Sequence, residues 1–271
     1  MIRTAIVLIN FFKEDELIQF VQDCLSKQLN DERLLVIVDN GSNSNSLDEV
    51  FQNSKQIVLL KPQSNLGYFG AARYAWAHLQ EKSIISDNFI ISNFDLEFDA
   101  KRFLDDTEIK SSATEASVIG PNILSSLSGA ALNPMYKGRL PLSKLKRLLF
   151  VTSFYPFFLV YQWFHHIKRS KSSASIREEG SAFVYAIHGS FMVIKRSYFE
   201  AGGSLNYKSF LYGEELFIAE ECRRLGLKIL YEPSLKMVHR EHTTTGNYKN
   251  SKHMKWLHQS LRYIRDRYYV S

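Results

Sequence analysis

The chain has 271 residues and is 45% hydrophobic, enough to bury a sizeable core as one large domain or as one domain with an appendage. Its two cysteines, Cys24 and Cys222, exclude a disulfide framework and lack the spacing of metal ligands, which favours a reducing compartment. The first apolar run is short and ends at Asn10 without the small-residue cleavage site of a signal peptide. We therefore interpret this run as the first strand.

The net charge of +6 is distributed unevenly along the chain. No acidic residue lies between Glu115 and Glu178, and that interval carries a charge of +9. The last stretch, residues 249–271, carries +5, which leaves the rest of the chain at −8. An acidic body with two basic segments predicts contact with an anionic surface, although no signature of a nucleic-acid-binding module accompanies the basic residues.

Apolar runs predict buried strands in the first half of the chain, at residues 5–9, 34–38, 57–60, 89–92 and 117–119. Apolar residues at helical spacing follow an acidic first turn at 14–16, and a Gly- and Ala-rich segment at 67–77 is also typical of a helix. This alternation predicts an α/β fold with a mainly parallel sheet covered by helices. Ligands of such sheets bind beyond the carboxyl ends of the strands, where Asn10, Asp39 and Asp95 lie.

After the strand at 117–119, the pattern changes to shorter elements. Further strands are predicted at 183–187, 191–194 and 227–231. A glycine-containing turn at 212–215 leads into a helix that ends at Gly226, and a Ser-rich stretch at 170–175 has the composition of a linker. The last helix carries apolar residues on one side and basic residues elsewhere, the apolar ones being Met254, Leu257, Leu261 and Ile264.

Two glycine-containing segments are candidates for contact with a nucleotide. The sequence VDNGS at 38–42 ends a strand in a turn, where Asp39 can accept hydrogen bonds from a ribose or a base. The sequence SNLGYFGAARYA at 64–75 leaves room for a ligand to approach the backbone and for Arg73 to reach a phosphate. Each segment also has a purely structural explanation, as an isolated turn or as close helix packing.

Carboxylates follow the strand at 89–92 at alternate positions, in the sequence NFDLEFD at 93–99. Alternate side chains of an extended chain point to the same side. Asp95 and Glu97 can therefore share one divalent cation, or they can face water beyond the end of the strand.

Taken in order, these segments resemble family 2 glycosyltransferases with the GT-A fold, in particular the rhamnosyltransferase-like branch that builds bacterial surface polysaccharides. The resemblance covers residues 3–125 and 180–245. It implies an inverting transfer of a sugar from a nucleotide diphosphate donor, such as a UDP- or dTDP-sugar with rhamnose as one candidate, assisted by Mg²⁺ or Mn²⁺. The shared order is VDNGS, N-L-G-x-x-G-A, N-x-D-x-E after a strand, G-S-F-M-V-I-K-R, G-G-S-x-N-x-x-x-F-L-Y-G-E-E and V-H.

The resemblance implies a donor side and a metal site. Asp39 matches the family's nucleotide-binding aspartate, and Asn65 with Gly67 matches its N-x-G element. Asp95 matches the metal-binding aspartate, and His239 matches a histidine that helps to hold the metal or the diphosphate. The same interpretation adds Glu97 to the metal ligands and adds to the donor contacts Asn10, Asn40, Arg73 and Asn93.

The resemblance also implies an acceptor side. Glu215 matches the candidate general base, with Glu214 before it, and we place Gly189 and Tyr212 on the same side. The chain departs from the family in having Glu-Glu at 214–215 in place of Glu-Asp, and Phe217 in place of a further aspartate. It also has Asn-Phe-Asp-Leu-Glu where the family has Asn-Pro-Asp or Asp-x-Asp.

The uncharged stretch at 148–167 is long enough to span a bilayer, but it contains Pro156 and has basic residues on both sides. A span would also place Asp95 and Glu215 on opposite sides of the membrane. Two interpretations stay open: a helical hairpin in the cytoplasmic leaflet, or an element packed on the catalytic body. Aromatic residues with basic flanks favour the membrane interface, namely Phe154, Tyr155, Tyr161 and Trp163.

We therefore predict a GT-A catalytic domain at 1–245 and a basic C-terminal helix at 246–271. Within the domain, a nucleotide-sugar-binding half spans 1–125, a basic aromatic insertion spans 130–176 and an acceptor-side half spans 180–245. The expected partners are a nucleotide-sugar donor, a glycan or lipid-linked glycan acceptor and an anionic membrane surface, without nucleic acid. The expected location is the cytoplasm, peripheral to the inner face of a bacterial cell membrane.

Two other functions compete with this prediction. A sugar nucleotidyltransferase should carry a Gly-rich, basic phosphate loop after the first strand, where this chain has Asn-Phe-Phe-Lys at 10–13. A non-catalytic relative would bind sugar nucleotides or scaffold an assembly, and the altered acidic motifs are the reason to consider it.

Overall fold

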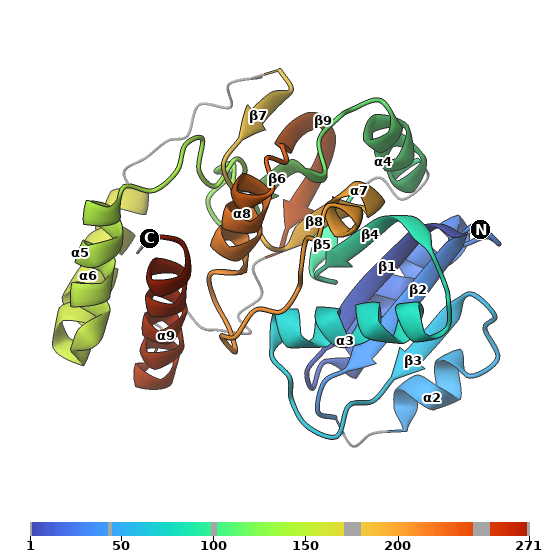
Figure 1. The fold of residues 1–271 in the computed structure, drawn as a ribbon. Coiled ribbons are helices and arrows are strands. Elements are labelled where there is room, and N and C mark those ends of the chain that lie inside the picture. Colours follow the sequence, from blue (N-terminus) through green and yellow to red (C-terminus); the bar gives the residue numbers. More distant parts are fainter. Residues whose placement is uncertain (1, 43–44, 99–101, 171–179, 241–249, 270–271) are drawn as a thin grey trace.

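The computed structural model describes residues 2–42, 45–98, 102–170, 180–240 and 250–269, with side chains described throughout except at 164–170. Figure 1 shows its arrangement of helices around one sheet. The strands are β1 (Ile2–Asn10), β2 (Arg33–Asp39), β3 (Ile57–Leu60), β4 (Ser86–Ser92), β5 (Leu96–Glu97), β6 (Val118–Ser125), β7 (Ala182–Val184), β8 (Phe191–Lys195) and β9 (Ile229–His239). The α-helices are α1 (Glu14–Phe20), α2 (Ser46–Phe51), α3 (Tyr68–Glu81), α4 (Phe103–Ser112), α5 (Leu142–Ser153), α6 (Tyr155–Ser170), α7 (Arg196–Glu200), α8 (Glu214–Arg224) and α9 (Ser251–Tyr268), and α1 continues into a π-helix (Val21–Leu25) and a 3₁₀ helix (Ser26–Gln28).

The described strands form a mixed sheet in the order β3-β2-β1-β4-β8-β6-β9-β5, and β7 pairs with β9. Strands β3, β2, β1 and β4 are parallel, as the alternation of strands and helices predicts. Strand β8 is antiparallel to both of its neighbours, and β6 and β9 are again parallel. The register pairs Asn10 with Asp39 and Leu8 with Ser92, so the ends of β1, β2 and β4 lie at one edge of the sheet.

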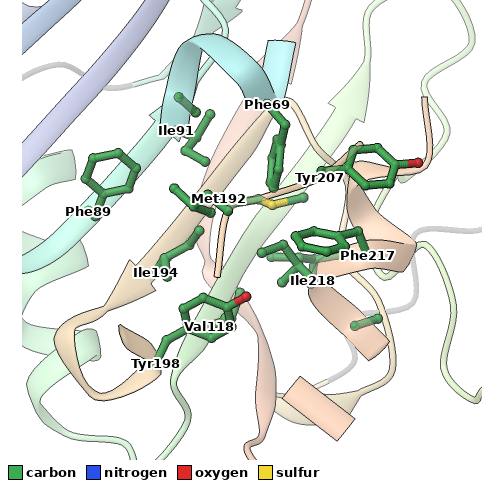
Figure 2. Packing of buried hydrophobic residues seen from close by; sticks show 14 of the residues in the cluster. Phe69, Phe89, Ile91, Val118, Met192, Ile194, Tyr198, Tyr207, Phe217 and Ile218 are labelled. Atoms are coloured by element: carbon green, nitrogen blue, oxygen red, sulfur yellow. The ribbon is translucent and has the colours of Figure 1, made fainter. Parts of the chain in front are cut away.

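The hydrophobic core packs α3 against α8, the two helices into which the predicted segments at 64–67 and 212–215 lead. Adjacent residues of β1 face opposite sides of the sheet, so Val7 belongs to a core with Phe69 of α3 and Leu8 belongs to a second core on the other side. In the first core, the ring of Phe69 lies 6.2 Å from the ring of Phe217 in α8, and Tyr207 packs between the two helices (Figure 2). Burial of these rings holds α3 and α8 together.

Strands are present at the predicted places, but several differ in length from the prediction. Strand β6, for example, ends at Ser125, six residues beyond its predicted end at 119. Strand β9 continues to His239, eight residues beyond its predicted end at 231, because β6 and β5 pair with it there. Strand β7 ends at Val184, because Ala186 instead forms a bridge with Tyr136. In the Ser-rich stretch predicted as a linker, residues 171–175 lie outside the described residues.

The uncharged stretch at 148–167 is divided between two helices rather than forming one. Phe154 has an extended backbone and separates α5 from α6, and Pro156 lies in the first turn of α6, where its missing N–H is tolerated. Helix α5 packs on α9, and the two helices lie at the same end of the molecule (Figure 1). No helix within the described ranges has both the length and the apolarity that a membrane crossing requires.

Candidate active site

The ends of β1 and β2 hold a buried aspartate in a network of amide and hydroxyl groups. Asp39 accepts a hydrogen bond of 3.0 Å from Nδ2 of Asn10 and one of 2.7 Å from the hydroxyl of Ser42. The backbone N–H of Ser42 also donates to Asp39. Pairing of β1 with β2 brings the two polar residues together, and the turn at 39–42 folds the hydroxyl back onto the carboxylate. Asp39 therefore has a defined orientation at the carboxyl edge of the sheet.

The next residue, Asn40, connects this edge to the segment at 64–67. Its Nδ2 donates to Asn65 Oδ1 at 2.9 Å and to the carbonyl of Gly67 at 3.2 Å, and its Oδ1 accepts from the N–H of Leu66 at 2.8 Å. Asn65 also accepts from the N–H of Gly67. The structure thus brings together three predicted donor-binding residues, and the amide of Asn40 shapes the segment that precedes α3.

Gly67 has a definite structural requirement. Its φ is +73°, and a Cβ at this position would lie 2.0 Å from the carbonyl oxygen of Phe210. The absence of a side chain at Gly67 therefore lets the backbone of the loop before α8 approach this position closely. This contact is the close packing that the sequence left open beside contact with a donor, and the donor contact of Gly67 stays a prediction.

The pairing of β5 with β9 brings Asp95 to His239, which is 144 residues later in the chain. The N–H of Arg240 donates to the carbonyl of Asp95, and His239 Nε2 lies 3.1 Å from Asp95 Oδ1. Both side chains are partly exposed, whereas Nδ1 of His239 is buried and has no hydrogen-bond partner within the described residues. The ring of His188 lies 5.9 Å from the ring of His239, so a second imidazole borders the pair.

The pair of Asp95 and His239 fits a divalent cation in part. A carboxylate oxygen and an imidazole nitrogen are both ligands of Mn²⁺ sites, and Mg²⁺ prefers oxygen and keeps several waters. Within the part of the chain that the structure describes, no group of three or more His, Cys, Asp or Glu side chains could hold a metal. A cation at Asp95 and His239 would therefore need further ligands from a bound phosphate or from water.

The structure gives Glu97 and Arg73 other partners. Glu97 is exposed and forms an ion pair with Arg240, in the wall of a cavity of about 450 Å³ that also includes Asp95. Arg73 lies on the exposed side of α3, and its guanidinium donates to Asn206 at 2.9 Å. Within the described residues, neither side chain hydrogen-bonds to the side chain of Asp39 or Asp95.

The loop at 188–190 joins the end of β4 to the start of α8. The N–H of Asn93 donates to the carbonyl of Ser190, and the N–H of Gly189 donates to Oε1 of Glu215 at 3.3 Å. A Cβ on Gly189 would lie 2.8 Å from the same carboxylate oxygen. Gly189 is therefore the residue that lets Glu215 approach the loop.

Sequence reasoning missed two tyrosines near the loop at 188–190, namely Tyr68 and Tyr136, the second of which forms a backbone bridge with Ala186. The hydroxyl of Tyr68 donates to the carbonyl of Gly189 at 3.1 Å. Burial raises the pKa of Tyr68 well above its usual value, and the charges of Glu214, Asp95 and Glu215 raise it further. The pKa of Tyr136 is also raised, first by burial and then by Glu215. An aromatic residue in the first turn of a helix has the pattern of a core residue, so no sequence signal distinguished Tyr68.

The turn that begins α8 has an unusual backbone. Tyr212 and Gly213 have φ values of +71° and +82°, so two consecutive residues adopt the left-handed conformation. Glu214 is buried, whereas Glu215 is partly exposed and reaches Gly189. Burial and then the charge of Glu214 raise the pKa of Tyr212 to about 12. The turn thus presents one acid to the loop at 188–190 and keeps the other in the interior.

The predicted acceptor-side residues Gly189 and Tyr212 therefore both adjoin the glutamate pair. The arrangement has the Asp95–His239 pair, a carboxylate at Glu215 and the Tyr68 hydroxyl on the loop at 188–190. The carboxylate of Glu215 is partly exposed beside Gly189, which is the geometry in which a side chain can accept a proton from a bound hydroxyl.

No protein-family model matches the chain, and no curated protein matches it. Solved structures do match. The crystal structure of GalNAc-T7 with UDP, GalNAc and Mn²⁺ superposes with a TM-score of 0.55 and 14% identity, covering 90% of this chain and 44% of that chain. The mannosyltransferase PcManGT from Pyrobaculum calidifontis, in complex with GDP-Man and Mn²⁺, superposes with a TM-score of 0.52 and 13% identity, covering 89% of this chain and 58% of that chain.

The chain therefore spans about half the length of these solved chains, at identities that establish likeness of fold alone. The assignment to family 2 and to its rhamnosyltransferase-like branch stays a prediction. The fold prediction is confirmed: the chain has the mixed α/β architecture of the GT-A glycosyltransferase fold.

Proposed function

We propose that the protein is an inverting glycosyltransferase that moves a sugar from a nucleotide diphosphate donor to a glycan or lipid-linked glycan. One observation carries the proposal: the loop at 188–190 borders both the Asp95–His239 pair and the Glu215 carboxylate. The ring of His188 lies 5.9 Å from the ring of His239, and the N–H of Gly189 donates to Glu215. Two structures of similar fold hold UDP or GDP-Man together with Mn²⁺, which supports a nucleotide-sugar donor and a divalent metal.

The donor would lie along the ends of β1, β2 and β4. Asp39 would accept hydrogen bonds from the ribose or base, with Asn10 holding its carboxylate in place. Asn40 and Asn65 would hold the segment before α3 in place beside the donor, because their side chains already hydrogen-bond to that segment. The remaining predicted donor contacts are Gly67, Asn93 and Arg73, of which Arg73 would have to exchange Asn206 for a phosphate.

Asp95 and His239 would hold Mg²⁺ or Mn²⁺. When bound, the cation would neutralise the negative charge that builds up on the departing nucleotide diphosphate. Glu97 would have to leave Arg240, or act through a water, to take part. The orientation of the ligands is built into the backbone, because β5–β9 pairing positions both residues before any ligand binds.

Glu215 would act as the general base. An inverting transfer requires the acceptor hydroxyl to lose its proton as it attacks the face opposite the leaving group, so the base belongs away from the metal. Glu215 meets this requirement because it comes from α8 and is partly exposed beside Gly189. Glu214 is buried and suits the start of the helix better, although it is the alternative base.

The acceptor would be a glycan or a lipid-linked glycan. The resemblance to enzymes of bacterial surface glycan synthesis favours UDP- or dTDP-sugars, with rhamnose as one candidate. A lipid-linked acceptor would place the protein at the cytoplasmic face of the cell membrane. The exposed aromatic residues of α5 and α6 support a peripheral location there.

A thermal-shift screen of nucleotide diphosphates and sugar nucleotides, each with and without Mn²⁺, tests the proposal. A ligand that binds only the folded state raises the midpoint of unfolding, so one nucleotide series should stabilise the protein in the presence of Mn²⁺. The same nucleotide should not stabilise Asp95→Ala. Stabilisation that is equal with and without Mn²⁺, or equal in Asp95→Ala, would contradict the metal-dependent site.

Turnover then separates the remaining alternatives. Release of the nucleotide diphosphate in the presence of an acceptor mixture supports transfer. Donor binding without release across a broad acceptor panel would favour the non-catalytic relative. Formation of a sugar nucleotide from a sugar phosphate and a nucleoside triphosphate would favour the nucleotidyltransferase.

A further inference from the structure

The exposed side of α5 and α6 is strongly apolar. Fourteen large hydrophobic side chains are exposed among the described residues, and six of them fall between residues 150 and 163. We call these six the α5–α6 apolar face: Phe150, Phe154, Phe157, Leu159, Val160 and Trp163. Scattered exposed apolar residues are ordinary, but a concentration on two neighbouring helices marks an interaction surface.

The face is continuous across the two helices. The ring of Phe157 in α6 stacks 5.4 Å from the ring of Phe150 in α5, and it also lies 5.4 Å from the ring of Phe154 between them. Along α6, Val160 follows Phe157 by three residues and Trp163 follows Val160 by three, so these side chains lie on one side of the helix.

The opposite side of the helix pair is already buried. Leu145 and Leu149 of α5 are in the core, and Phe158 of α6 is almost fully covered. Thr152 of α5 lies within hydrogen-bond distance of His258 of α9, 3.0 Å from Oγ1 to Nδ1. The helices are therefore anchored to the body through one side, which answers the question left open by the sequence: they pack on the body and also present an apolar surface.

The charge beside the face is positive. Lys146 and Arg147 are exposed one turn before Phe150 on α5, and no acidic residue occurs between 115 and 178. Not every basic residue of the insertion contributes to this charge. Arg139 forms a bidentate ion pair with the buried Glu220, so it belongs to the interior of the molecule.

We propose that the α5–α6 apolar face docks on the surface of an anionic phospholipid bilayer. The aromatic side chains would enter the headgroup region, and Lys146 and Arg147 would contact lipid phosphates. A second copy of this chain fits less well, because a symmetric pair would bring the basic residues of both copies opposite one another. Docking of this face on a bilayer does not require the transfer reaction, because it depends only on the exposed apolar side chains and on the positive charge beside them.

Vesicle co-sedimentation of the full chain, without donor or metal, tests the inference. The protein should bind vesicles that contain phosphatidylglycerol and should bind pure phosphatidylcholine vesicles much less, and added salt should weaken the binding. The double variant Lys146→Gln/Arg147→Gln should lower the partition coefficient about 25-fold, because each basic residue near an anionic surface contributes about fivefold. The matched control is Lys27→Gln/Lys82→Gln, which removes two exposed lysines elsewhere and should bind like the wild type.

The apolar part of the face is tested in the same assay. Phe150→Ser/Phe157→Ser should lose vesicle binding, whereas Ile109→Ser, at a residue 61% exposed on α4, should not. Circular dichroism should show all variants folded, because the substituted side chains are exposed. The chain has three tryptophans, and Trp163→Phe should remove the blue shift of emission that vesicles induce.

Three outcomes would overturn the inference. Binding that is absent, or equal for neutral and anionic vesicles, would reject an anionic bilayer. Loss of binding in Ile109→Ser equal to that in Phe150→Ser/Phe157→Ser would reject this face. Loss of a concentration-dependent dimer in Phe150→Ser/Phe157→Ser, with vesicle binding unchanged, would assign the face to a second copy.

Discussion

The hydroxyl of Tyr207 lies 2.5 Å from the hydroxyl of Ser260, a fully buried residue of α9. The same Tyr207 hydroxyl donates to the carbonyl of Tyr212 at 2.8 Å, so Ser260 must be the donor in its own bond to Tyr207. A Cβ on Gly213 would lie 2.1 Å from the hydroxyl oxygen of Ser260. Helix α9 therefore contacts the left-handed turn that presents Glu214 and Glu215, and it is part of the structure of the candidate site.

Substitution of Ser260 tests this contact. Ser260→Ala should cost about 1 kcal/mol of stability, the usual contribution of one hydrogen bond. It should also lower turnover by about tenfold at unchanged donor affinity, because small displacements of a catalytic group are costly. Ser251→Ala, at an exposed serine of the same helix, is the control. Equal turnover in both variants would show that α9 supports the fold without positioning the turn.

Gly189→Ala tests the approach of Glu215 to the loop at 188–190. The new Cβ would lie 2.8 Å from Glu215 Oε1, and Gly189 does not have a positive φ, so the contact and not the backbone should decide the outcome. We expect turnover to fall at least tenfold with donor affinity near the wild-type value. Gly138→Ala, where a Cβ would meet nothing within 4 Å, should leave both quantities unchanged. Normal turnover of Gly189→Ala would show that the contact between Glu215 and this loop is not required for the reaction.

Asp95→Ala should abolish metal-dependent donor binding while the protein stays folded. The β5–β9 pairing uses the backbone carbonyl of Asp95, which alanine retains, and the carboxylate is partly exposed. Calorimetric titration with the nucleotide diphosphate and Mn²⁺ measures the effect. Glu97→Ala should have a smaller effect, because Glu97 already pairs with Arg240. If Asp95→Ala binds the nucleotide diphosphate and Mn²⁺ with unchanged affinity, Asp95 is not part of the donor site.

Glu215→Gln should keep donor affinity near the wild-type value and cut turnover by roughly a hundredfold or more, the usual scale for loss of a general base. The amide oxygen of glutamine can still accept the hydrogen bond from Gly189, so the geometry is retained while the base is lost. Steady-state release of the nucleotide diphosphate measures the change. Normal turnover of Glu215→Gln together with an inactive Glu214→Gln would exchange the roles of the two acids.

Several features of this protein were predictable from local sequence. Continuous apolar runs predicted β1 and β2, because the central positions of a strand buried on both faces are apolar. The apolar run at 57–60 also predicted β3, which lies at the end of the sheet and is mostly only partly buried. Asn10 and Asp39 were predicted at one edge because parallel strands end on the same side of a sheet, and their side chains are in fact hydrogen-bonded. The turn that contains Gly213 was predicted before a helix, and Gly213 has a positive φ. The helix predicted at 67–77 is α3, and Gly67 precedes its first residue with a positive φ.

The tertiary structure decided the contacts between distant segments. The partner of Asp95 depends on β9 extending to pair with β5, and the sequence pattern ended that strand eight residues too early. The position of Tyr68 beside Gly189 and that of Ser260 beside Tyr207 join residues 121 and 53 apart in the chain. Hydrophobic periodicity reports which face of an element is buried, but not which element buries it. The choice of partner depends on the packing of whole side chains in three dimensions, and that information is not local to any stretch of the chain.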